Sequence, residues 1–160
     1  MAKAIPDGFN SISAHVVVRG AAKAMEFYKK AFGAEEIMRM PGPDGQSVMH
    51  GEVRIGNSTL MLVDENPQMG CKSAQTFGGT PVTLHLYVSD ADAAFQRAVA
   101  AGAEVRMPVS DMFWGDRYGQ VADPFGLTWS IAQHVKDLTP EQIGKAAQEF
   151  FATMGGKCGG

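Results

Sequence analysis

Cysteine is scarce in this chain, and long hydrophobic runs are missing. Its 160 residues include two cysteines, Cys71 and Cys158, which are too few to suggest a disulfide scaffold. No apolar segment approaches the ~18 residues that a membrane-spanning helix needs, and the N-terminal residues contain no hydrophobic signal core. We therefore expect a cytoplasmic protein with free thiols and no membrane contact.

An excess of positive charge is also missing. The net charge is -3 and the pI is about 5.8, so the chain has no general electrostatic attraction for nucleic acid. The sequence contains no GxSxG nucleophile motif and no glycine-rich phosphate loop of the GxGxxG or GxxxxGK[ST] type. These absences argue against nucleic-acid binding, serine hydrolase chemistry and nucleotide binding.

What the sequence does contain is an internal repeat. SAHVVVRG at 13–20 and TLHLYVSD at 83–90 are both strand-like, and their histidines, His15 and His85, are 70 positions apart. A helix-like run ending in Gly-Ala-Glu follows each, with Gly33 and Gly102 69 positions apart. Turn-plus-strand patterns come next, with Gly56 and Gly126 again 70 apart. The order of these landmarks predicts a duplicated unit of roughly 50 residues.

Each unit is predicted to be a strand, a helix and three further strands. The first helix spans about residues 21–32, because its apolar residues recur at helical spacing and Gly33 suits the position just past its end. The second is predicted to start at Ser89 and to end before Gly102. The predicted strands lie around residues 36–40, 48–55, 59–63, 105–107, 118–122 and 128–132.

The remaining segments connect and extend these units. We expect one domain over 1–160 made of units 10–64 and 81–134, with a linker at 65–80 that is rich in turn residues. Thr139, Pro140 and Gln142 predict the start of a C-terminal helix over 139–154. Its apolar stripe, which includes Phe150 and Phe151, suggests packing within the subunit or in a homodimer.

These features resemble the vicinal oxygen chelate superfamily, the group of glyoxalases, bleomycin-resistance proteins and extradiol dioxygenases. Its PhnB-like branch is similar through MEFYKKAFGAE, HGEVRIGNSTLMLVDE and FWGDRYGQVADPFGLTWSIAQH, and the resemblance covers about residues 10–139. It implies an α+β fold in which two βαβββ units form curled sheets around a cavity, with helices outside and the C-terminal helix added.

Strand alternation then predicts which side chains line that cavity. On the strand at 128–132, Trp129 and Ile131 are predicted to be buried in the core, so Ser130 between them faces the cavity. Gln120 is predicted to be the repeat partner of His50, and Trp114 lies in a loop at the cavity mouth. The candidate ligand-binding residues are His15, His50, Glu52, Tyr87, Trp114, Gln120 and Ser130.

The resemblance also implies a divalent metal held by histidines on the first strands and glutamates on the last strands of the units. At the corresponding positions the chain offers His15, Leu60, His85 and Ser130, so both carboxylates are missing. Metal sites of this kind usually need three or more protein ligands. The first hypothesis is therefore a small-molecule-binding protein without the full metal site.

Two alternatives stay open. One is a metal-dependent lyase, isomerase or dioxygenase that uses His15 and His85 together with a non-standard carboxylate, Glu52. In it a metal would act as a Lewis acid on the substrate while a carboxylate moves a proton. The other is an interaction module whose cavity is filled by side chains.

Overall fold

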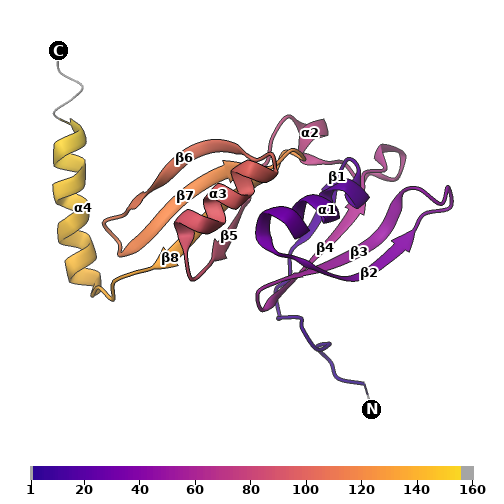
Figure 1. Cartoon of the computed structure of the whole chain (residues 1–160), viewed down its shortest axis with the longest axis horizontal. Helices are drawn as coiled ribbons and strands as arrows, with labels where there is room; N and C mark the ends of the chain where they lie inside the picture. The colour runs from indigo at the N-terminus through magenta and orange to yellow at the C-terminus, as the bar shows by residue number, and fades with distance from the viewer. Residues whose placement is uncertain (1, 156–160) are drawn as a thin grey trace.

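The computed structural model describes residues 2–155, so Cys158 lies outside the described residues. Two units follow one another along the chain, and a helix extends from the end of the second (Figure 1). The elements of the first unit are β1 (His15–Val18), α1 (Ala21–Phe32), β2 (Glu35–Pro41), β3 (Val48–Ile55) and β4 (Ser58–Asp64). Those of the second are β5 (Thr83–Tyr87), α3 (Ala91–Ala101), β6 (Glu104–Asp111), β7 (Asp116–Ala122) and β8 (Thr128–His134).

Each unit forms a four-stranded mixed sheet of the same topology. The strand orders are β1-β4-β3-β2 and β5-β8-β7-β6, and in both sheets the first pair is parallel while the others are antiparallel. The predicted α+β fold with two βαβββ units is confirmed. Curling of the sheets around a cavity stays a prediction.

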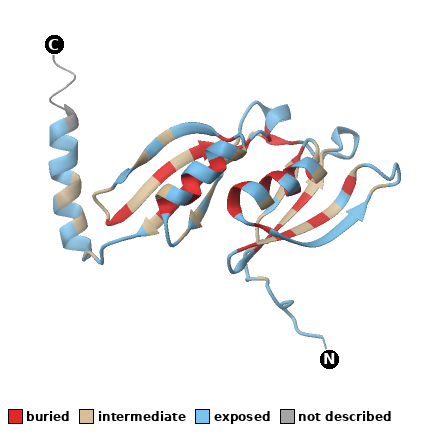
Figure 2. Cartoon of the chain, in the orientation of Figure 1, coloured by how far each residue is buried: buried red, intermediate tan, exposed pale blue. Residues whose placement is uncertain are grey.

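One helix covers one face of each sheet, and we call the opposite face the open face. Buried residues gather where α1 and α3 meet their sheets (Figure 2). Two glycines permit the close approach. A Cβ on Gly51 of β3 would lie 3.1 Å from the Met25 sulfur of α1, and one on Gly119 of β7 would lie 2.9 Å from the Phe95 ring of α3. Glycine therefore stands at the same place in both units.

A buried carboxylate joins the two units. Asp123, in the turn between β7 and β8, is 6% exposed and accepts hydrogen bonds from the Tyr28 hydroxyl of α1 at 2.9 Å and from the Trp129 indole at 3.0 Å. Its other oxygen accepts the backbone N–H groups of Phe125 and Leu127, both at 2.9 Å. Burial raises the pKa of Asp123, and these donors oppose that rise. The Asp-Pro-Phe-Gly motif is therefore a structural link between units.

The observed helix ends agree in part with those predicted from the sequence. Gly33 and Gly102 end α1 and α3 in the left-handed conformation, as predicted. The predicted start of the second helix at Ser89 is wrong, because Asp90 is the cap and its carboxylate accepts the N–H of Ala93 at 2.9 Å. The N-terminus of α1 is capped from a distance by Asp64, which accepts the N–H groups of Gly20 and Ala21 at 2.7 and 2.8 Å.

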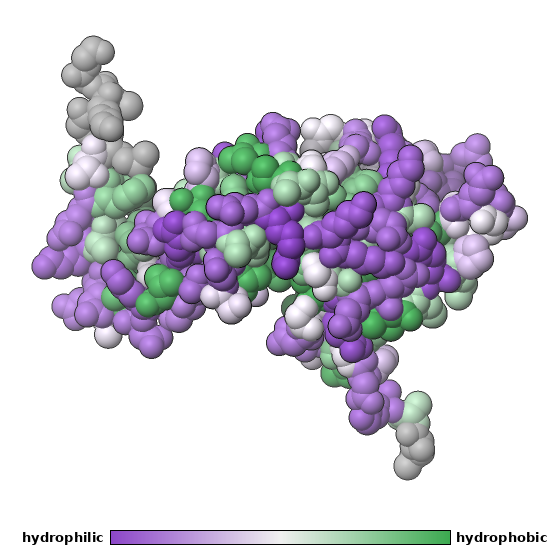
Figure 3. Space-filling model, viewed as in Figure 1, coloured by the Kyte–Doolittle hydropathy of each residue, from purple (hydrophilic) through white to green (hydrophobic). Residues whose placement is uncertain are grey.

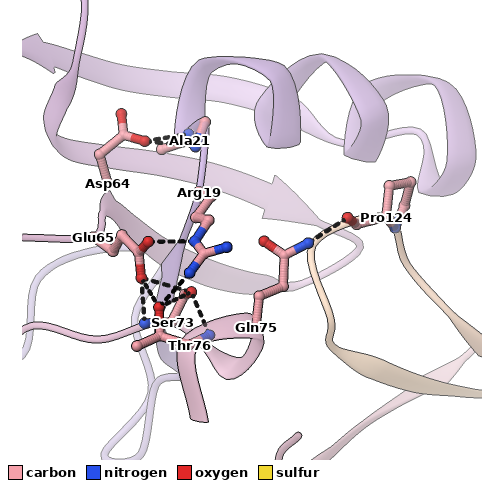
Figure 4. A network of polar contacts seen from close by, with 9 residues as sticks. Arg19, Ala21, Asp64, Glu65, Ser73, Gln75, Thr76 and Pro124 are labelled. Atoms are coloured by element: carbon pink, nitrogen blue, oxygen red, sulfur yellow. Dashed lines mark hydrogen bonds and ion pairs between the residues drawn. The ribbon is translucent and has the colours of Figure 1, made fainter. Parts of the chain in front are cut away.

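The segment between the units has structure of its own. It contains the short helices η1 (Pro67–Met69) and α2 (Ala74–Phe77). Figure 4 shows Glu65 at the centre of a network, where it pairs with Arg19 and accepts hydrogen bonds from Ser73 and Thr76 at 2.8 and 2.6 Å. These bonds, chiefly those from Thr76 and Arg19, lower the pKa of Glu65 to about 2. They fix α2 to the first unit.

The last helix, α4 (Pro140–Gly155), lies apart from the sheets (Figure 1). Its start is a reciprocal capping box: Thr139 accepts the N–H of Gln142 at 3.3 Å, and the Gln142 side chain accepts the N–H of Thr139 at 2.8 Å. Figure 3 shows paler, more apolar side chains on the side of α4 that faces the body. None of the helices within residues 2–155 is long and apolar enough to cross a membrane.

Candidate functional site

Equivalent rows of side chains run across the open faces of the two sheets. In each row four residues are neighbours in register, one from each strand. The first row is His15, Met61, Glu52 and Met38, and the second is His85, Ser130, Gln120 and Met107. The two rows therefore correspond position by position, starting from the repeated histidines.

This register corrects two predicted equivalences. Leu60 is 5% exposed and packs in the core, while Met61 is the register partner of His15. Glu52, rather than His50, is the counterpart of Gln120, since they pair with Met61 and Ser130. The turns before β4 and β8 differ in length, so aligning their glycines shifts the register by one residue, which reverses the side-chain faces. Methionine, like leucine, is not a carboxylate, so the inference of missing carboxylates is unchanged.

The open face of the first unit combines imidazole, carboxylate and thioether groups. The His50 Nε2 lies 2.9 Å from a Glu52 oxygen, and the rings of His15 and His50 are centred 6.5 Å apart. The row neighbour Met38 is 39% exposed, and Met40, beside His50 in the register, is 41% exposed. Three of the predicted ligand-binding residues therefore share this face.

The open face of the second unit is aromatic and uncharged around its histidine. The Ser130 hydroxyl, which is buried, lies 2.7 Å from Nδ1 of His85. The His85 ring is centred 4.6 Å from that of Tyr87 and 5.9 Å from that of Tyr118. Gln120 donates from Nε2 to the Tyr118 hydroxyl at 2.6 Å. Ser130, Tyr87 and Gln120 thus gather around His85.

A buried carboxylate organises the end of this aromatic face. Asp116 is 4% exposed and accepts hydrogen bonds from the Tyr87 hydroxyl at 2.9 Å and from the Trp114 indole at 3.2 Å, while Nδ1 of His134 lies 2.8 Å away. Burial favours a raised pKa, but the bonds from His134, Tyr87 and Trp114 outweigh it and hold the pKa of Asp116 below its usual value. The bonds to Asp137 and Asp116 raise the pKa of His134.

The sequence did not single out His134 as a candidate. A signal was available, because His134 has the same strand parity as Ser130 and therefore lies on the open face of β8. Trp114 lies beside Tyr118, with rings centred 5.5 Å apart, and the ring of Phe113 is centred 5.4 Å from that of Phe150 of α4. The turn that carries Trp114 therefore connects the aromatic face to α4.

The two open faces offer few donor atoms of the kind that a divalent metal needs. The four equivalent positions hold His15, Met61, His85 and Ser130, which supply two imidazoles, a thioether and a neutral hydroxyl. Within residues 2–155, no three or more His, Cys, Asp or Glu side chains lie together in a way that could hold a metal ion. The residues present therefore do not fit the two-histidine, two-glutamate set that the resemblance implies.

Comparison with known proteins agrees with this architecture. The model of the Glyoxalase/Bleomycin resistance protein/Dioxygenase superfamily matches residues 8–131. The chain belongs to this superfamily. An uncharacterized protein of Mycobacterium tuberculosis is 52% identical over 136 residues, which cover 83% of this chain and 79% of that relative.

Solved structures give the same result for the fold. The X-ray structure of a gene product from Arabidopsis thaliana is 32% identical, with a TM-score of 0.64 over 78% of this chain and 98% of that one. A PhnB protein from Bacillus cereus, described as a putative 3-demethylubiquinone-9 3-methyltransferase, is 19% identical, with a TM-score of 0.62 over 78% and 99% of the two chains. At that identity the likeness supports the fold alone.

Proposed function

We propose that this superfamily member binds a small organic molecule on its open faces without the divalent metal set of the family's enzymes. The observation that carries the proposal is the pair of rows in which Met61 and Ser130 occupy the positions expected of carboxylates. Placed polar groups beside aromatic walls are typical of small-ligand sites. On the second face, Tyr87 and Tyr118 supply the walls, and Gln120 supplies an amide.

A ligand screen tests this proposal. Ligand-observed NMR with a library of aromatic and heteroaromatic fragments would be performed on the wild type and on Gln120→Trp, which places a large ring over the second row. A matched variant, Gln148→Trp, adds the same ring on exposed α4. We expect fragment signals that Gln120→Trp removes and Gln148→Trp retains. A screen in which no fragment is lost from Gln120→Trp alone, or no binding at all, would contradict the proposal.

The metal-dependent alternative rests on the first open face. His15, His50 and Glu52 share that face, and Glu52 is already bonded to His50. If a lyase, isomerase or dioxygenase used Glu52 as a ligand or base, Glu52→Gln would abolish both metal binding and turnover. Metal titrations of the wild type and Glu52→Gln distinguish this alternative from the metal-free proposal.

A homodimer in the cytoplasm is part of the same proposal. Phe150 and Phe151 on α4 are 40% and 62% exposed, and their contact with Phe113 leaves apolar surface that a second copy can cover. The free thiol of Cys71 is exposed, which suits a reducing compartment. Light scattering of the wild type and of Phe151→Ser checks the assembly: we expect a dimer that the substitution weakens, and an unchanged mass would contradict this interface.

A further inference from the structure

A cavity of about 590 Å³ lies at the junction of the two units, and we call it the junction cavity. This size is within the ~300–1,000 Å³ range of small-ligand sites. Its walls are mainly apolar and come from the β1 region, the connecting segment, the start of β5 and the turn before β8. The lining includes His15, Val17, Lys72, Phe77, Val82 and Leu127.

One wall of the junction cavity is held in place before any ligand arrives. Helix α2 is tied to the first unit through Glu65. Its carboxylate accepts hydrogen bonds from Ser73, which precedes the helix, and from Thr76 within it (Figure 4). It is tied to the second unit by Gln75, whose Nε2 donates to the Pro124 carbonyl at 3.1 Å. A wall fixed to both units costs little ordering entropy on binding, which favours a ligand site over a transient gap.

The permanent charge at the cavity is positive. Among the side chains that line it, within the part of the chain that the structure describes, Lys72 alone carries a permanent charge. Its ammonium lies 6.0 Å from the centre of the Phe77 ring, and no described carboxylate pairs with it. The acidic neighbour Glu65 is engaged by Arg19, Ser73 and Thr76. A cation is therefore left free beside an apolar cavity.

We propose that the junction cavity takes an amphipathic organic anion, whose ring or chain packs against Val82 and Phe77 and whose carboxylate or sulfonate pairs with Lys72. The inference rests on the proposed function, because His15 belongs both to this cavity and to the first row. It adds a ligand class that the rows alone do not specify. An anion forms an ion pair with Lys72, whereas a neutral molecule of the same shape gains apolar contact only.

A pair of fluorescent probes separates charge from shape. Anilinonaphthalene sulfonate carries a negative charge, and phenylnaphthylamine has the same ring skeleton without it. Both would be titrated into the wild type and into Lys72→Gln. Because Lys72 is exposed and its ion pair is worth up to ~1 kcal/mol, we expect Lys72→Gln to weaken the sulfonate by about fivefold. Binding of phenylnaphthylamine should not change.

Two further variants serve as controls. Lys145→Gln makes the same change of charge on α4 and should affect neither probe, while Val82→Trp fills the cavity from an exposed position and should weaken both. Equal effects of Lys72→Gln on the two probes, or an effect of Lys145→Gln as large as that of Lys72→Gln, would overturn the inference. So would the absence of probe binding, or binding that Val82→Trp leaves unchanged.

The outcomes also separate this inference from the proposed function. If Val82→Trp weakens both probes but Lys72→Gln changes neither, Lys72 does not select for charge, and the anion class is rejected while small-molecule binding stands. The fragment experiment with Gln120→Trp tests the second row, which contributes no residue to the lining used here. Its failure would reject the proposed function whatever the probes show.

Discussion

The two units share a topology but differ on their open faces. The first row holds Glu52 and Met61 where the second holds Gln120 and Ser130. The first face therefore pairs imidazole with a carboxylate, whereas the second surrounds His85 with tyrosines and neutral hydrogen-bonding groups. The repeated histidine is kept in both.

The two units thus share a frame but differ in the chemistry of their open faces. Gly51 and Gly119 keep the helix close to the sheet in both units, and the register is the same. The carboxylate on the open face of the second unit lies outside the row, at Asp116, which is buried and accepts hydrogen bonds from Tyr87 and Trp114.

The largest effect is expected at the turns that precede β4 and β8. Replacing Asp123 with alanine leaves two buried side-chain donors and two backbone N–H groups without their acceptor. The free energy of unfolding should therefore fall by ~3–5 kcal/mol. In the first unit, Asn57→Ala changes an exposed turn residue and should cost less than ~0.5 kcal/mol. Urea unfolding measures both, and similar costs for the two variants would contradict the structural role of Asp123.

A smaller effect is expected from the carboxylates of the open faces. Asp116→Ala removes the acceptor of Tyr87 and Trp114 and should cost ~2 kcal/mol, whereas Glu52→Ala loses one partner, His50, and should cost under ~1 kcal/mol. Trp114 emission should shift to longer wavelength in Asp116→Ala only, because its indole N–H is released. If both variants melt alike with unchanged emission, Asp116 does not organise this face.

The smallest effect is a pH dependence with opposite signs at two carboxylates. Glu65 has its pKa lowered to about 2 from 4.5, so the stability it contributes is present above pH 4.5 and is lost as the pH falls toward 2. The difference in melting temperature between wild type and Glu65→Gln should therefore shrink over that range. Asp123 has a raised pKa, so its contribution relative to Asp123→Asn should decrease as the pH rises above 3.8. The same sign at both positions would contradict these environments.

Local sequence patterns were sufficient to predict much of the fold. Strand alternation correctly placed Trp129 and Ile131 in the core and His50 and Glu52 on the side of β3 that faces away from the core, because successive side chains point to opposite faces. The offset of 70 residues could not give the cross-unit register, since the two turns have different lengths.

Long-range polar contacts are what the sequence could not reveal. Asp64 caps α1 from 43 positions away, and Asp123 reaches Tyr28 across 95 positions. Both depend on tertiary packing and have no local signature. The predicted linker likewise gave no sign that Glu65 and Gln75 fix α2 to both units.

Metal titration measures directly whether the two open faces hold a divalent ion. Calorimetry with Ni²⁺ and Zn²⁺ would compare the wild type with the double variant Met61→Glu, Ser130→Glu, which supplies both missing carboxylates. We expect no stoichiometric binding to the wild type and at least about tenfold tighter binding to the double variant. Stoichiometric metal binding by the wild type that His85→Ala abolishes would contradict it.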